Sequence, residues 1–175
     1  MEWVYRGRCW IFGDNVGIDG DIMPLRFAMA RETRPEILKN HVMEGLIPNF
    51  PELVAPGDII VAGKRFAQGN PHIYGFIGIR ALGLGVVAES IPRGSYRNVV
   101  NAGVAVLPFC PGVSGEADQG DLLEVDFLSG SFTNLTRGTQ CHYAPLSPVL
   151  LKIVEAGGWE PMFRTRLNAW NSKNA

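Results

Sequence analysis

The chain contains 175 residues, of which 46% are apolar and 19% are charged, and its formal net charge at pH 7 is −1. A chain of this length can bury the core of one globular domain, and its charge balance gives no support for nucleic acid as a partner. The sequence has no run of eighteen apolar residues, and charges interrupt its N-terminal segment. We therefore expect no membrane span, no signal peptide and a cytoplasmic protein.

Three cysteines, Cys9, Cys110 and Cys141, are spread along the chain without a Cys-x-x-Cys pair. An odd number at this spacing is typical neither of a disulfide framework nor of a zinc or iron–sulfur site. We predict isolated thiols, one or two of them buried, and no cluster bound by this chain.

The first predicted element is a strand over residues 1–12, where apolar and charged residues alternate weakly. Residues 13–26 are rich in Gly, Asp and Asn, which is the composition of a loop. Leu25 stands where an EF-hand needs its twelfth-position Glu, so no calcium site is expected. We expect Asp14 and Asp19 to fix a tight loop rather than to act as acids.

A basic segment, residues 27–34, leads into a predicted helix that begins near Pro35 and runs to about Met43. Proline is favoured in the first helical turn, and Glu36 lies where the helix dipole favours a negative charge. Glycine and proline residues then separate this helix from the next strand.

Residues 57–98 predict a βαβ unit, with strands at 58–62 and 86–88 and a helix from about residue 71 to 82. Its strands should be parallel, joined by a right-handed crossover, and central to the sheet. In such a unit the loop between the first strand and the helix normally carries the function. That loop reads Phe66-Ala67-Gln68-Gly69-Asn70-Pro71-His72.

The rest of the chain predicts a helix, a strand, a β-hairpin and a last helix. Their ranges are 95–102, 104–107, 121–128 with 131–136, and 147–156. Together with the βαβ unit, these elements predict an α/β fold with a mixed sheet.

Several separate motifs match one known family in order and spacing over nearly the whole chain. The chain resembles the small subunit of 3-isopropylmalate dehydratase, which is similar to the swivelling domain of aconitase. The motifs are Phe12-Gly13-Asp14-Asn15, Ile22-Met23-Pro24, Arg26-Phe27, Pro56-Gly57-Asp58-Ile59-Ile60-Val61-Ala62-Gly63 with Phe66, Ala88-Glu89-Ser90, Tyr96-Arg97-Asn98 with Gly103, Gly120-Asp121 through Asn134-Leu135-Thr136, and Glu155-Ala156-Gly157-Gly158.

The resemblance implies one barrel-like α/β swivel domain over residues 1–175, with a mixed sheet and a βαβ core. Residues 27–50 would then be a loop and helix that close over the substrate. It also implies a large partner subunit that holds a [4Fe–4S] cluster through its own cysteines, and a small carboxylic acid as substrate. The implied activity is that of a hydro-lyase, which hydrates, dehydrates or isomerises a hydroxy acid and whose small subunit is inactive alone.

The chain departs from the family in the loop that carries the family's chemistry. Where the family has Gly-Ser-Ser-Arg-Glu, this sequence has Gly69-Asn70-Pro71-His72-Ile73. In the family the first Ser removes a proton, and the second Ser and the Arg bind a carboxylate. Asn70 cannot act as a base, and Pro71 has neither a hydroxyl nor an N–H. His72 can carry a charge near neutral pH but lacks the two-pronged geometry of Arg.

Two interpretations of this loop stay open. Asn70 and Pro71 are favoured at the N-cap and first position of a helix, so the loop could serve only to start the helix. Alternatively, the loop is an altered site at a helix N-terminus, in which Gly69, Asn70 and the N–H groups of His72 and Ile73 receive an anionic or carbonyl group. His72 would be its titrating residue.

Further candidates lie in the segment that closes over the substrate in the family. Arg26, Arg31 and Arg34 either reach substrate carboxylates or form a solvated basic face. Met29 falls at the family's specificity position, where an apolar residue suits an alkyl substituent.

The remaining polar candidates have simpler interpretations. Asn98 and Arg97 match the family's Tyr-Arg-Asn and are expected to hold the loop in place. Lys64 and Arg65 either steer anions or are surface charges. His41 and His142 are not expected to be metal ligands, because neither has neighbours at metal-ligand spacing.

These observations favour the small subunit of an aconitase-like hydro-lyase that works with a cluster-bearing large subunit. A second hypothesis is a different lyase or isomerase whose base comes from the partner subunit. A third is a non-catalytic partner or binding module that keeps the swivel fold.

Overall fold

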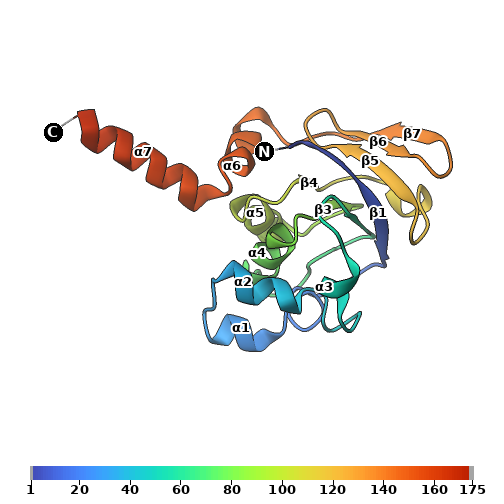
Figure 1. Cartoon of the computed structure of the whole chain (residues 1–175), viewed down its shortest axis with the longest axis horizontal. Coiled ribbons are helices and arrows are strands. Elements are labelled where there is room, and N and C mark those ends of the chain that lie inside the picture. Colours follow the sequence, from blue (N-terminus) through green and yellow to red (C-terminus); the bar gives the residue numbers. More distant parts are fainter. Residues whose placement is uncertain (1, 174–175) are drawn as a thin grey trace.

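The structure, a computed structural model, describes residues 2–173 and is built on one seven-stranded mixed sheet with the strand order β4-β3-β2-β1-β5-β6-β7. Strands β1 to β4 are parallel neighbours, and β5, β6 and β7 extend the sheet beyond β1 in antiparallel pairs. The sheet curls around its helices in a barrel-like α/β fold (Figure 1), as the family resemblance implies. The strands are β1 (Val4–Phe12), β2 (Ile59–Ala62), β3 (Gly85–Ala88), β4 (Val106–Leu107), β5 (Leu122–Asp126), β6 (Ser131–Asn134) and β7 (Thr139–His142).

The parallel half of the sheet is covered on both faces. Strands β2 and β3 are apolar throughout, and each of their residues is buried. Continuous apolar runs are typical of strands in this environment. One face packs on helices α4 (Tyr74–Ala81) and α5 (Arg93–Asn101), which lie beside β3 in Figure 1. The opposite face forms a second core with side chains of β5 and β6.

Strand β1 joins these two cores, because successive side chains of a strand point to opposite faces. Cys9 is buried in one core and Trp10 in the other. The prediction that β2 and β3 are parallel neighbours is confirmed. Both strands lie in the interior of the sheet, since each pairs on both edges. The middle strand of the seven is β1, because β5 pairs with its other edge.

The segment between β1 and β2 contains four short helical elements. They are α1 (Leu25–Met29), α2 (Pro35–Leu38), the 3-10 turn η1 (Lys39–His41) and α3 (Phe50–Leu53). The predicted helix begins at Pro35 as expected but does not reach Met43. It ends because Val42 is extended and Met43 has a left-handed φ of 57°. In that conformation the Met43 N–H donates to the carbonyl of Ile22 at 2.8 Å, which ties this segment to the loop after β1.

The predicted hairpin, which β5 and β6 form, and the predicted last helix, α6 (Pro148–Glu155), are confirmed. The hairpin turn contains Gly130 with a φ of 88°, and a Cβ there would lie 1.9 Å from the carbonyl oxygen of Tyr143. Strand β7 and helix α7 (Trp159–Lys173) are not predicted by the sequence analysis.

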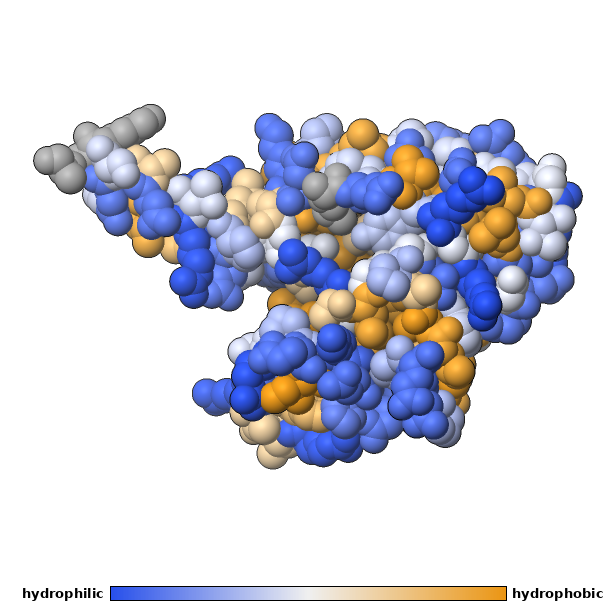
Figure 2. Space-filling view, in the orientation of Figure 1, coloured by the Kyte–Doolittle hydropathy of each residue, from blue (hydrophilic) through white to orange (hydrophobic). Residues whose placement is uncertain are grey.

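Helix α7 extends away from the body of the molecule (Figure 1), and Figure 2 shows apolar side chains along it between hydrophilic ones. Trp159, Phe163 and Leu167 are among the exposed apolar residues of this helix. None of the helices between residues 2 and 173 is long and apolar enough to cross a membrane.

Candidate functional site

The candidate site lies where the loops that follow β1 and β2 meet. Because β1 and β2 are parallel neighbours, their carboxyl ends lie at the same edge of the sheet. The two loops pair through Gly17 and Gln68. The Ile18 N–H donates to the Gln68 carbonyl at 2.8 Å, and the Gln68 N–H donates to the Val16 carbonyl at 2.9 Å. The loops therefore form one interlocked unit.

The loop after β2 is also fixed from the side of β3 and α5. The Phe66 N–H donates to the carbonyl of Ser90 at 3.0 Å, and the Ser95 hydroxyl donates to the carbonyl of Ala67 at 2.5 Å. Ala67 has a left-handed φ of 63°, a conformation that an alanine keeps only when its surroundings enforce it. The contacts from both sides supply that constraint.

Asn98 holds the chain immediately before His72. Its side-chain amide donates to the carbonyl of Pro71 at 2.6 Å, which confirms the expected loop-holding role of Asn98. The Pro71 ring packs against Gly94 of α5 so closely that a Cβ at Gly94 would lie 2.9 Å from ring carbons.

His72 contacts Asp19 of the neighbouring loop. Its Nδ1 lies 2.8 Å and 2.9 Å from the two carboxylate oxygens of Asp19, and its Nε2 lies 3.3 Å from the side-chain nitrogen of Asn70. The His72 and Asp19 side chains are 28% and 24% exposed, so the pair is shielded on one side and open on the other.

Asp14 and Asp19 both contact the loop after β2: the Asp14 carboxylate accepts from the Lys64 N–H at 2.7 Å, and Asp19 contacts His72. Asp21, which the sequence analysis does not single out, fixes the first loop internally, because its carboxylate accepts from the Gly17 N–H at 2.7 Å. The proximity of Asp19 and His72, 53 residues apart, follows from the pairing of β1 with β2, which composition and spacing do not reveal.

The helix-start interpretation of this loop is wrong. Helix α4 begins at Tyr74, and its N-cap residue is Ile73, without a side-chain capping bond. Asn70 and Pro71 lie outside the helix because the His72 N–H donates to the Asn70 carbonyl at 2.8 Å in a tight turn. The same bond occupies the His72 N–H, so that group is not open to an anion.

The three arginines expected near the substrate have different surroundings. Arg26 lies 3.2 Å from a Glu44 oxygen and 3.3 Å from Nδ1 of His41, and Arg34 pairs with Glu32 at 2.6 Å. Arg31 follows α1 with a left-handed φ of 51°. The structure brings Arg26 and Arg34 to acidic neighbours rather than to His72, so their proposed contacts with a substrate require a rearrangement.

Met29 ends α1 with a side chain that is 79% exposed. An apolar side chain this open is free to contact a molecule that approaches the segment. The position fits the expectation of a contact residue but does not test it.

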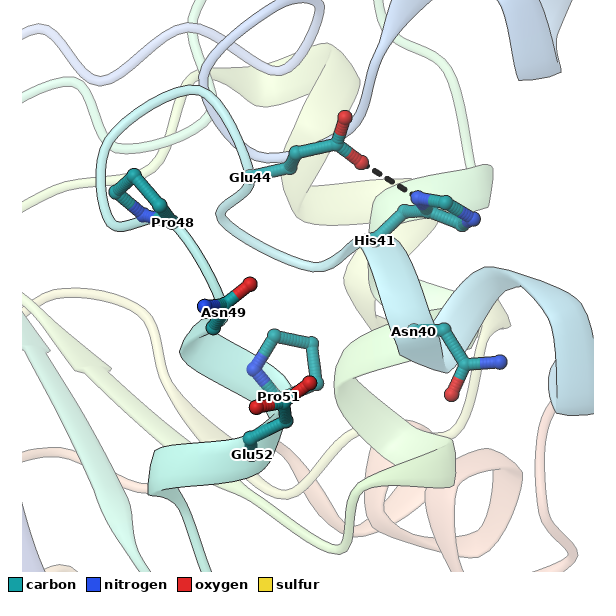
Figure 3. Close-up of a pocket in the computed structure, with 7 residues that line it drawn as sticks. All are labelled: Asn40, His41, Glu44, Pro48, Asn49, Pro51 and Glu52. Atoms are coloured by element: carbon teal, nitrogen blue, oxygen red, sulfur yellow. Dashed lines mark hydrogen bonds and ion pairs between the residues drawn. The ribbon is translucent and has the colours of Figure 1, made fainter.

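A cavity of about 440 Å³ is lined in part by His41 and Glu44, the two residues that contact Arg26. Figure 3 shows the residues that line it. Figure 3 shows the Glu44 carboxylate directed at the His41 ring, and the distance from Glu44 Oε2 to His41 Nδ1 is 2.5 Å. The hydrogen bond from His41 lowers the pKa of Glu44, and Arg26 adds to the effect. The lining residues are Asn40, His41, Glu44, Pro48, Asn49, Pro51 and Glu52. The cavity is thus a separate feature from the loop that holds His72.

The cysteines are isolated, as the sequence predicts. All three are free; Cys9 and Cys110 are buried and Cys141 is half-buried. Burial raises the pKa of Cys9 and of Cys110 to about 12. Within residues 2–173, no group of three or more His, Cys, Asp or Glu side chains is arranged to hold a metal ion.

Comparison with known proteins finds relatives that are named as small subunits of enzymes. No protein-family model matches the chain. The chain is 39% identical to the isopropylmalate/citramalate isomerase small subunit of Methanocaldococcus jannaschii, over 95% of this chain and 98% of the relative. It is 41% identical to 3-isopropylmalate dehydratase small subunit 1 of Methanopyrus kandleri, over 90% and 91%. It is 39% identical to the methanogen homoaconitase small subunit of Methanothermobacter thermautotrophicus, over 90% and 89%.

The fold has a counterpart among crystal structures. A 3-isopropylmalate dehydratase from Methanocaldococcus jannaschii superimposes with a TM-score of 0.84 at 30% sequence identity. The match covers 97% of this chain and 99% of that chain. The similarity therefore extends over both loops of the candidate site and not only over the sheet.

Proposed function

Because this chain belongs to the family of 3-isopropylmalate dehydratase small subunits, we propose that it is the small subunit of an aconitase-like hydro-lyase that acts on a hydroxy-carboxylic acid. Its relatives carry the names of dehydratase, isomerase and homoaconitase small subunits. The proposed reaction is the loss or the addition of water next to a carboxylate. Loss of water followed by its addition at the neighbouring carbon would isomerise the hydroxy acid.

The proposed partner is a large subunit that carries a [4Fe–4S] cluster. The name "small subunit" of the relatives supports a larger partner. The placement of the cluster on that partner is supported by Cys9 and Cys110, which are buried with raised pKa, whereas a cluster ligand must be a thiolate. When bound there, the cluster would polarise the hydroxyl group that leaves the substrate.

The loop after β2 is the proposed contribution of this chain to the active site. His72 is proposed as its reacting group and Asn70 as its polar neighbour, with Gly69 and Ile73 as backbone that borders the substrate. The support is positional: His72 lies at the carboxyl end of β2, in the loop that carries the base in the resembled family, and its ring is partly open to solvent. This position of His72 is the observation that carries the proposal.

Residues 27–50 are proposed to close over the substrate. Arg26, Arg31 and Arg34 supply positive charge for carboxylate groups when the segment moves, and the exposed Met29 contacts an alkyl substituent. A substrate with one apolar branch is therefore proposed over one with an additional carboxylate. Residues 1–175 would work together as one swivel-type domain.

A cytoplasmic location is proposed for the assembled enzyme. All three cysteines are free, as is usual in the reducing environment of the cytoplasm.

The test is anaerobic co-expression of the chain with candidate cluster-bearing large subunits, followed by isolation of any complex. The complex is assayed for dehydration and hydration on a panel of 2- and 3-hydroxy acids that differ in their apolar branch. The large subunit alone and this chain alone are the controls. A complex that consumes one of these acids, with both separate chains inactive, supports the proposal. A stable complex that consumes none would favour a non-catalytic partner.

A further inference from the structure

We infer that Asp19 is a positioning residue that makes His72 the general base of this site, and that Asn70 occupies the place which the substrate takes. The inference rests on the proposed hydro-lyase function and goes beyond it, since it replaces the serine base of the resembled family with a carboxylate–histidine pair. The pair joins the loops after β1 and β2.

The contacts of His72 define which ring nitrogen carries the proton. A carboxylate only accepts hydrogen bonds, and both oxygens of Asp19 lie within 2.9 Å of Nδ1. Nδ1 therefore donates, and the lone pair of a neutral ring lies on Nε2. The side-chain nitrogen of Asn70, 3.3 Å from Nε2, is a donor and fits the same tautomer. The contact with the acceptor-only carboxylate of Asp19 thus leaves Nε2 as the basic atom of the ring.

The Asp19 side of the pair is held by a closed turn. The Gly20 N–H donates to the Met23 carbonyl at 2.9 Å, and the Gly17 N–H donates to the Asp21 carboxylate at 2.7 Å. The carboxylate of Asp19 is the one in this turn that reaches the neighbouring loop.

The His72 side is held equally well. Asn98 fixes the preceding carbonyl, and the Tyr74 ring lies against the imidazole with 6.0 Å between ring centroids. A base whose orientation exists before the substrate binds avoids the cost of ordering it during the reaction.

The proposed step is a proton transfer from carbon. Nε2 of His72 takes the proton from the carbon next to the substrate carboxylate, so a C–H bond breaks and an N–H bond forms. The electron pair of that C–H bond becomes the new C=C bond as the C–O bond of the neighbouring hydroxyl breaks. The hydroxide leaves with the electron pair of the C–O bond, and the imidazolium then releases the abstracted proton to this hydroxide or to solvent. The sum is loss of one water, and His72 is neutral again. Asp19 stays ionised and stabilises the imidazolium that forms.

Asn70 has a defined part in this scheme. Its side-chain amide contacts Nε2 of His72 while no substrate is bound. The C–H group of the substrate must take the place of this amide beside Nε2. Asn70 cannot itself accept a proton near neutral pH, so it acts by contact and not as the base.

The decisive variant is Asp19→Asn, measured in the complex with the large subunit. We expect kcat to fall about 100-fold with KM changed less than about threefold, since general-base catalysis contributes 10²- to 10⁴-fold and substrate contacts remain. Asp19→Glu should recover part of the loss. The matched control is Asp118→Asn, which changes an exposed carboxylate that pairs with Arg137 and lies outside both loops of the site. Its kcat should stay within about twofold.

Two further readouts separate a base from a merely structural histidine. In His72→Ala, added imidazole should restore a measurable fraction of kcat. In the chain itself, the ¹⁵N shifts of His72 should show the proton on Nδ1, and Asp19→Asn should shift the ring toward the other tautomer. The thermal midpoint of each variant shows whether it folds.

The outcomes distinguish the two proposals. A wild-type complex that consumes no hydroxy acid overturns both. An active complex in which folded Asp19→Asn keeps its kcat, or in which the proton of His72 lies on Nε2, overturns the pair and leaves the hydro-lyase function standing. An active complex with the kcat loss, the imidazole rescue and the Nδ1 proton supports the pair.

Discussion

The indole N–H of Trp10 in β1 donates to the carboxylate of Asp58, directly before β2, at 2.9 Å. The carboxylate also accepts from the backbone N–H of Arg8 at 2.8 Å and of Ala55 at 3.1 Å. Asp58 is 4% exposed, so these bonds replace the water it would otherwise bind. Asp58 thereby joins the two strands whose loops form the candidate site.

Replacing Asp58 with alanine should be strongly destabilising. The change leaves three N–H groups without their acceptor in a buried place, and we expect a loss of about 3 kcal/mol in the free energy of unfolding. Urea unfolding measures it. Asp118→Ala is the control, because that carboxylate is 80% exposed, and it should cost less than about 1 kcal/mol. Equal losses in both variants would contradict the structural role of Asp58.

Gly94→Ala should disturb the site more than the fold. A Cβ at Gly94 would press on the Pro71 ring at 2.9 Å and displace the residue before His72. Alanine within α5 gains about 1 kcal/mol of helix propensity, which offsets the clash in stability but not in geometry. We expect kcat/KM to fall about tenfold or more with a thermal midpoint close to that of the wild type.

The control for Gly94→Ala is Gly115→Ala, since a Cβ at Gly115 has no neighbour within 4 Å. It should leave kcat/KM unchanged. Full activity in Gly94→Ala would show that the position of Pro71 does not matter to the site.

Glu44 should make the segment around α1 sensitive to acid. The hydrogen bond from His41, together with Arg26, lowers the pKa of Glu44 below the ordinary 4.5. A carboxylate with a lowered pKa in the folded state contributes stability that is fully present above about pH 4.5. That contribution is lost as the pH falls through the lowered pKa.

The measurement is the thermal midpoint of wild type and Glu44→Gln between pH 3 and 7. The two curves should lie apart above pH 4.5 and converge at the acid end. Because the three side chains are between 33% and 57% exposed, the gap should correspond to less than about 1 kcal/mol and shrink in high salt. A gap that widens toward acid would contradict the assignment.

Sequence patterns predict the main elements of this fold for identifiable reasons. The apolar run of β2, the glycine turn at Gly130 and the proline start of α6 are local signals, and each element forms where the signal lies. The order of strands is not local: β1 is central only because β5 pairs with it across more than a hundred residues.

The candidate site shows the same limit. The βαβ pattern predicts the loop that contains His72, and the family resemblance predicts that Asn98 holds this loop in place. The contact with Asp19 depends on the register between two loops, and the late start of α4 depends on the turn at Asn70. Local helix preference favours Asn70 and Pro71 as a helix start, but the neighbouring loop and Asn98 hold them in another conformation.

The three thiols should differ in reactivity in the native protein. Burial raises the pKa of Cys9 and Cys110 to about 12, and the two side chains have no exposed surface. Cys141 is half-buried and donates to the Tyr143 hydroxyl oxygen, and its pKa is raised as well. At pH 8, iodoacetamide should label Cys141 slowly and leave Cys9 and Cys110 unlabelled, as mapped by peptide mass analysis.

Labelling of the unfolded chain in urea provides the reference, in which all three should react alike. Rapid native labelling of Cys9 or Cys110 would show that the core near β1 opens easily.

The relative roles of Asn70 and His72 can be separated by truncating each to alanine. Asn70 contacts Nε2 but cannot accept a proton, so Asn70→Ala should lower kcat less than about tenfold and act mainly on KM. His72→Ala removes the proposed base and should lower kcat about 100-fold or more. Steady-state kinetics on the complex measure both. In the double variant the loss should be no larger than in His72→Ala, because Asn70 has no partner left at Nε2. Losses that multiply, or an Asn70→Ala loss in kcat as large as that of His72→Ala, would mean that Asn70 contacts the reacting substrate independently of the histidine.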